Sequence, residues 1–127
     1  MNELFRQWTE SSINPEYYEF LRELNEDEAL ERREEPEFDR EWIAEFKRLE
    51  KMREQLSEQE LVAIASLREQ AFKQSYRVLS SPDVSAYISD DLELIALSLL
   101  LGETSSWALQ TLKLSYDEGR FPPCEGK

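Results

Sequence analysis

The stretch Asp90–Leu101, with the sequence DDLELIALSLLL, is the most apolar part of this 127-residue chain. Its leucine, isoleucine and alanine side chains fall on nearly every side of a helix, which is typical of a helix at the centre of a domain. The ten residues from Leu92 are too few to span a bilayer, for which about 20 are needed. We therefore predict a buried helix over about residues 90–101, capped by Ser89 and ended by Gly102.

Helix-start signals divide the chain on the N-terminal side of this segment. Asn14 precedes Pro15, a combination that favours a helix start, and the residues behind it predict a helix that continues to about Glu34. Pro36 is expected to end this helix, because proline cannot continue the hydrogen-bond ladder. Asp39 is then predicted to cap the next helix.

Two further helices are predicted from similar signals. Ser57 and Glu60 have the spacing of a capping box and begin a long amphipathic segment. On the C-terminal side, Thr104 or Ser105 is expected to cap a last helix, which Gly119 ends. The prediction is an all-α domain over residues 1–127, with five or six helices around the central one and a short extended tail from about residue 120.

The charge balance excludes several classes of function. The chain has 28 acidic residues, 15 basic residues and no histidine, which gives a net charge of −13. A surface of this charge repels nucleic acid and anionic membranes, so neither is expected as a partner. Residues 1–10 lack the apolar segment of a signal peptide, and the single cysteine, Cys124, is compatible with a reducing compartment.

Much of the negative charge lies in one part of the sequence. Residues 16–60 contain 17 acidic and 8 basic residues, a net charge of −9. Such a run is either a solvated helix face or a surface that meets a basic partner. On the second interpretation, Tyr17 or Tyr18 is an aromatic anchor, because one of two adjacent helical residues is expected to face outward. The candidate partner-binding acids are Glu26, Asp27, Glu28, Glu31, Glu34, Glu35, Glu37 and Asp39.

The sequence gives little evidence for a catalytic site. Glu31, Glu34 and Glu37 are spaced three apart, as in helical bundles that hold divalent metals, but a chain with 28 acids produces this spacing by chance. Without histidine there is no activating base for Cys124, which is expected to be inert. No catalytic residue, metal or cofactor is therefore predicted. Trp42 and Trp107 fall on apolar stripes and are expected in the core.

The segment Asp90–Pro122, DDLELIALSLLLGETSSWALQTLKLSYDEGRFP, resembles the helical hairpin of small bacterial immunity proteins that neutralise polymorphic or contact-dependent toxins. The resemblance implies a non-enzymatic protein that binds a cognate toxin, often a basic nuclease domain, and blocks its active site in the cytoplasm. It does not assign interface residues, because immunity interfaces differ between families.

The leading hypothesis is therefore an inhibitor, and specifically an immunity protein, that binds a basic protein through its acidic side chains. The alternatives are a helical adaptor or regulatory subunit and a metal-dependent all-α nucleotide phosphohydrolase. An enzyme would need a pocket with converging acids and measurable turnover, whereas an inhibitor needs neither.

Overall fold

The computed structural model describes residues 2–123, in which there are six α-helices, two 3-10 helices and no β-strand. This confirms the all-α prediction. In chain order the helices are α1 (Glu3–Ser12), the 3-10 helix η1 (Pro15–Glu23), α2 (Glu26–Arg33), α3 (Pro36–Glu50), the 3-10 helix η2 (Arg53–Gln55), α4 (Glu58–Val78), α5 (Pro82–Leu101) and α6 (Trp107–Asp117). None of them has both the length and the apolar character needed to cross a membrane.

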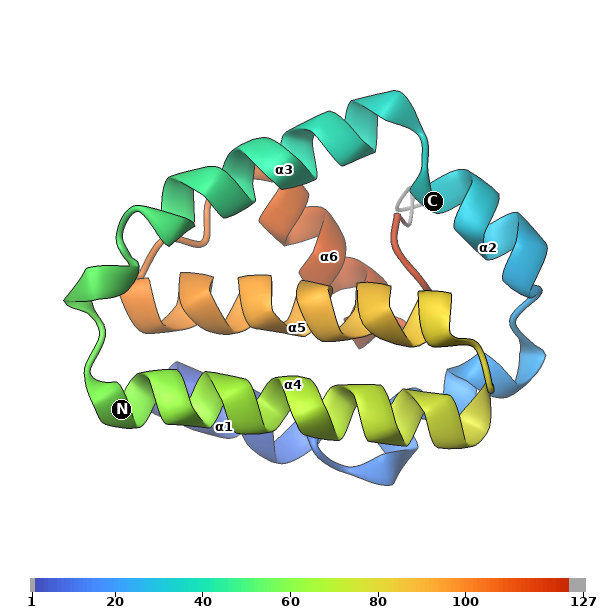
Figure 1. Cartoon of the computed structure of the whole chain (residues 1–127), viewed down its shortest axis with the longest axis horizontal. Coiled ribbons are helices and arrows are strands. Elements are labelled where there is room, and N and C mark those ends of the chain that lie inside the picture. The colour runs from blue at the N-terminus through green and yellow to red at the C-terminus, as the bar shows by residue number, and fades with distance from the viewer. Residues whose placement is uncertain (1, 124–127) are drawn as a thin grey trace.

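Helix α5 lies at the centre of the fold, as predicted. Figure 1 shows α4 alongside it, α3 on its opposite side, and α6 and α1 behind the two front helices. Thirteen of its 20 residues are buried, so neighbours cover most of its surface. Ile95 and Leu99 are in the core, and Gly102 ends the helix in the left-handed conformation with a φ of 73°. At that φ a side chain would strain the backbone, which is why glycine suits the position.

The predicted start of α5 at Ser89 was wrong. The helix begins at Pro82, where the hydroxyl oxygen of Ser81 accepts a hydrogen bond from the Val84 backbone N–H. No glycine or proline interrupts the chain from there to Leu101, so the helix continues. Ser89 lies in the middle of the helix, and its hydroxyl donates to the backbone carbonyl of Arg68 in α4 at 3.1 Å.

The boundaries on the N-terminal side also differ from the prediction. Instead of one helix to residue 34, η1 ends at Glu23, and the Asn25 side chain caps a separate helix, α2, by accepting from the Glu28 N–H. Helix α3 begins at Pro36, because proline fits the first helical position, where no N–H is needed. Asp39 therefore lies inside the first turns of α3 and is not its cap.

The cap of the last helix was misplaced by one or two residues. Ser106, and neither Thr104 nor Ser105, caps α6 by accepting a hydrogen bond from the Leu109 N–H at 3.2 Å. After α6, residues 120–123 have no regular secondary structure. Phe121 in this segment is buried. Residues 120–123 therefore contribute to the core through Phe121.

Replacing Ser57 with alanine should lower the free energy of unfolding by about 1 kcal/mol. The Ser57 hydroxyl accepts from the Glu60 N–H at 3.1 Å, and the Glu60 carboxylate accepts from the Ser57 N–H at 2.8 Å, which confirms the capping box. Urea unfolding followed by circular dichroism measures the loss. Ser66→Ala, at an exposed site of the same helix, is the matched control and should change stability by less than about 0.5 kcal/mol. Equal losses in both variants would contradict the capping role.

Candidate functional site

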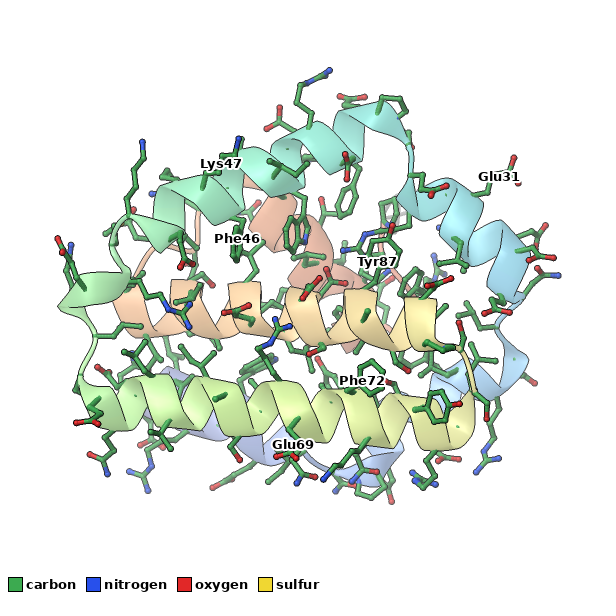
Figure 2. All side chains as sticks on the ribbon, viewed as in Figure 1. Glu31, Phe46, Lys47, Glu69, Phe72 and Tyr87 are labelled. Carbon is green, nitrogen blue, oxygen red and sulfur yellow. The ribbon has the colours of Figure 1, made fainter. Side chains whose placement is uncertain are left out.

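The predicted partner-binding acids lie on α2, on the turn after it, and on the first turns of α3. These two helices meet at the turn formed by Glu34 and Glu35, at one corner of the molecule (Figure 1). Figure 2 shows Glu31 pointing away from the other helices. All eight side chains are exposed, and together they are called the acidic surface: Glu26, Asp27, Glu28, Glu31, Glu34, Glu35, Glu37 and Asp39.

Arg33, in the middle of this acidic run, points inward. Its side chain is 4% exposed and pairs with Asp91 of α5, which is fully buried. Nη1 of Arg33 donates to Oδ2 of Asp91 at 2.7 Å, and Nη2 donates to Oδ1. Burial alone would lower the pKa of Arg33, but the Asp91 carboxylate outweighs this effect and raises it. Arg33 therefore remains charged, and its charge is neutralised in the interior.

Asp91 also accepts hydrogen bonds from two other helices. Nε1 of Trp42 in α3 donates to Oδ1 at 2.9 Å, and the hydroxyl of Tyr116 in α6 donates to Oδ2 at 2.6 Å. Arg33, Trp42, Tyr116 and Asp91 form what we call the Asp91 cluster. A buried ion pair needs additional hydrogen bonds of this kind to offset its loss of water. The cluster ties α2, α3 and α6 to α5, and it therefore fixes where the acidic surface lies.

Aromatic rings surround the guanidinium group of Arg33. Its central carbon lies 4.6 Å from the ring centroid of Tyr87, 5.3 Å from that of Phe38 and 5.5 Å from that of Phe121. Rings at these distances attract a cation through their negative faces. The side chain that positions α2 is thus held both by a carboxylate and by aromatic rings.

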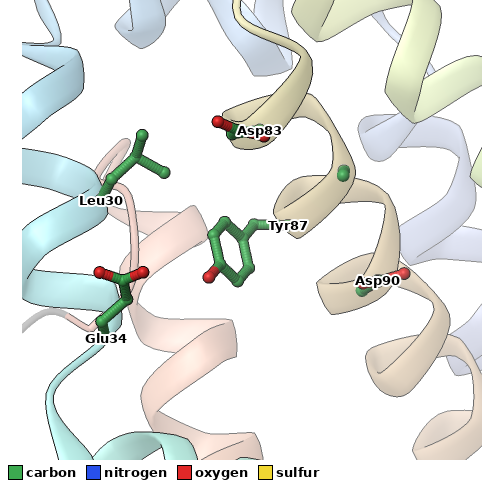
Figure 3. A pocket seen from close by; sticks show the side chains of 6 residues that line it. Leu30, Glu34, Asp83, Tyr87 and Asp90 are labelled. Atoms are coloured by element: carbon green, nitrogen blue, oxygen red, sulfur yellow. The ribbon is translucent and has the colours of Figure 1, made fainter.

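A groove with a volume of about 310 Å³ lies between α2 and α5. In Figure 3 the Tyr87 ring projects from α5 into the space between the two helices, towards Glu34. Asp83 and Asp90 lie above and below Tyr87 along α5 in the same view. The residues that line the groove are Leu30 and Glu34 from α2 and Asp83, Ala86, Tyr87 and Asp90 from α5.

The two adjacent tyrosines predicted as anchors both point into the protein. Tyr18 is fully buried, and its hydroxyl donates to the backbone carbonyl of Ser12 at 2.6 Å. Tyr17 is half-buried, with its ring stacked on that of Tyr116 at a centroid distance of 6.0 Å. The expectation that one of them faces outward is not met, because η1 packs against both α1 and α4.

These tyrosines should make the fold sensitive to alkali. Burial raises the pKa of Tyr17, Tyr18 and Tyr116 above the ordinary value of 10.0. A raised pKa in the folded state means that their contribution to stability is fully present below about pH 10 and is lost as the pH rises through the raised values. The absorbance of tyrosinate near 295 nm should therefore rise together with the loss of helical circular dichroism. Ionisation of all five tyrosines of the chain near pH 10 without unfolding would contradict this expectation.

The two tryptophans predicted in the core are both partly exposed. Trp107 is not in the core as expected, because its side chain is 51% exposed; one side of it rests against Phe38, with ring centroids 6.0 Å apart. Trp42 is half-buried.

Within residues 2–123, no group of three or more acidic or thiol side chains is arranged to hold a metal ion. Cys124, expected to be inert, lies outside the described residues.

Comparison with protein families decides the affiliation of the chain. The family model for immunity protein PIM1 matches residues 5–123, a span that includes the acidic surface, the groove and the Asp91 cluster. The chain belongs to the PIM1 immunity protein family. This affiliation confirms the resemblance to immunity proteins of toxin systems. A search of curated proteins gave no match for this PIM1 family member.

Sequence reasoning missed the residues that organise the site in this PIM1 family member. Arg33 lies in the charged run of residues 16–60, where side chains are expected at the surface, and a helix capped by Ser89 would have Asp91 in its first turn. One signal was available. Asp91 and Glu93 are charged residues inside the most apolar helix of the chain, and charged side chains are almost never buried without a partner.

Proposed function

We propose that this chain neutralises a toxin by binding it through the acidic surface, without catalysing a reaction. Membership of the PIM1 immunity protein family supports a toxin as the partner. The observation that carries the finer proposal is the exposure of all eight carboxylates on helices that a buried ion pair holds in place. In this proposal the chain acts in the cytoplasm of the cell that it protects.

The charge of the acidic surface favours a basic partner. Of the two arginines in α2, Arg33 is buried against Asp91, and Arg32 donates to the backbone carbonyl of Pro123 at 2.6 Å. Eight exposed carboxylates lie within residues 26–40, against two exposed arginines, Arg32 and Arg40, so the net charge of this surface is strongly negative. A nuclease domain fits this surface, because it needs lysine and arginine side chains to hold substrate phosphates. Carboxylates that pair with those cations would keep the substrate out.

Capture of the partner followed by a protection assay tests the proposal. The immobilised chain is used to isolate its partner from the native host, and mass spectrometry identifies it. The identified protein is then produced in cells with and without this chain. We expect the partner alone to stop growth and co-production to restore it, with a stoichiometric complex on size-exclusion chromatography. A captured protein that is harmless, or that remains toxic in the presence of the chain, would contradict the proposal.

A further inference from the structure

The groove between α2 and α5 combines two kinds of lining. The carboxylates of Glu34, Asp83 and Asp90 supply negative charge, while Leu30, Ala86 and the ring of Tyr87 supply apolar surface (Figure 3). A volume of about 310 Å³ is large enough for one long side chain. A lining of this kind suits a side chain with an apolar stem and a positive end, because the stem can pack while the charge meets carboxylates.

The carboxylates of the groove are not all occupied by internal partners. Asp90, one of the three, pairs with Arg68 of α4 at 2.9 Å. Within residues 2–123, Glu34 and Asp83 form no ion pair and accept no side-chain hydrogen bond. Two of the carboxylates that line the groove are therefore available to an external cation.

The protein itself shows how the ring of Tyr87 packs against a guanidinium group. The ring of Tyr87, which lines the groove, also lies 4.6 Å from the guanidinium carbon of Arg33, whose charge is met by Asp91. An aromatic ring together with carboxylates is the environment that guanidinium prefers, since it stacks on the ring and donates hydrogen bonds in its own plane. The groove lining likewise combines the Tyr87 ring with carboxylates.

We propose that the groove between α2 and α5 binds an arginine side chain of the toxin, with its guanidinium group between Tyr87, Glu34 and Asp83. This inference rests on the proposed function and adds a specific anchor to it. The acidic surface attracts the basic partner, and the groove fixes the position of one of its arginines. Such a division is physically reasonable, because exposed charges mainly raise the association rate, whereas enclosed charge pairs slow dissociation.

A direct test needs no toxin. The ¹⁵N-labelled chain is titrated with N-acetyl-L-arginine amide, and N-acetyl-L-citrulline amide serves as the uncharged probe of the same shape. We expect the arginine probe to shift the amide signals of residues 30–34 and 83–90 with half-saturation in the millimolar range, and the citrulline probe to leave them in place. Equal shifts with both probes, or shifts spread over all acidic helices, would overturn the proposal.

Variants separate the groove from general electrostatic attraction. The double substitution Glu34→Gln with Asp83→Asn removes two charges, and Ala86→Leu fills the groove at an exposed position without changing charge. Each should weaken binding of the arginine probe by about threefold or more. Glu69→Gln, on the exposed face of α4, is the control and should leave it unchanged (Figure 2). Unchanged binding by Ala86→Leu would show that the groove is not the site.

The same variants distinguish failure of the groove from failure of the proposed function. Surface plasmon resonance against the identified toxin should show dissociation at least about tenfold faster for Ala86→Leu than for Glu69→Gln. If the chain protects cells but Ala86→Leu binds the toxin as well as the unchanged protein does, the groove assignment is wrong and the proposed function stands. If the arginine probe binds in the groove but the chain gives no protection, the assignment of that arginine to a toxin is overturned.

Discussion

Replacing Asp91 with alanine is expected to lower the free energy of unfolding by about 3–5 kcal/mol. The substitution leaves the Arg33 charge in the interior without its carboxylate, and it removes the acceptor for both Trp42 Nε1 and the Tyr116 hydroxyl. Restoring water to these groups would require α2 to move away from α5. Urea unfolding monitored by circular dichroism, together with hydrogen exchange of the α2 amides, measures both effects.

The neighbouring residue supplies the control. Asp90→Ala removes a carboxylate one position away, where the pair with Arg68 is well exposed and so worth about 0–1 kcal/mol. A second variant, Arg33→Met combined with Asp91→Ala, removes both charges and should be less destabilised than the sum of the two single variants. Equal effects at Asp90 and Asp91, or strict additivity in the cycle, would mean that the Asp91 cluster does not hold the fold together.

Neutralising four carboxylates of the acidic surface is expected to weaken toxin binding by at least about 100-fold, because charge pairs enclosed in an interface cost about 2–5 kcal/mol when truncated. The variant replaces Glu28, Glu31, Glu34 and Glu35 with glutamine. It should keep the stability of the unchanged protein, since these side chains are exposed. Surface plasmon resonance at low and high salt measures the effect, and the association rate of the unchanged protein should fall as salt rises.

A second block variant tests whether position matters or only total charge. Glu10, Glu54, Glu58 and Glu69 are exposed on other elements, and replacing all four with glutamine changes the net charge by the same amount. We expect this control to slow association slightly and to leave dissociation unchanged. If both block variants lose binding equally, the acidic surface acts only through the electrostatic field of the protein's net charge. If neither loses binding, the contact lies elsewhere on the molecule.

The features predicted well from sequence are those decided by neighbouring residues. The capping box at Ser57 depends on two residues three positions apart, and the end of α5 depends on the single glycine at position 102. The burial of α5 follows from its own composition. In each case the residues that cause the feature lie within one or two helical turns of it, so the local sequence is enough to predict it.

The features predicted poorly depend on contacts between distant segments. Arg33 and Asp91 are 58 residues apart, and nothing local to either shows that one neutralises the other. Ser89 has the composition of a cap, but in the folded chain its hydroxyl bonds to α4. Trp107 lies on an apolar stripe, yet the neighbouring helices cover only part of it. For the site, the exposure of the eight acids could be predicted, whereas the groove beside them could not.

The inward direction of Arg33 has a consequence for which residues of this protein can change without loss of the fold. The residues that hold α2 in place, Arg33 and Asp91, are buried, while the carboxylates that face the solvent make no contribution to that attachment. Substitutions at exposed positions usually change stability by less than about 0.5 kcal/mol. If these carboxylates contact a toxin, as we propose, they can be exchanged one at a time, and each intermediate sequence still folds. Under that proposal, the specificity for a partner can change while the buried pair that positions α2 stays the same.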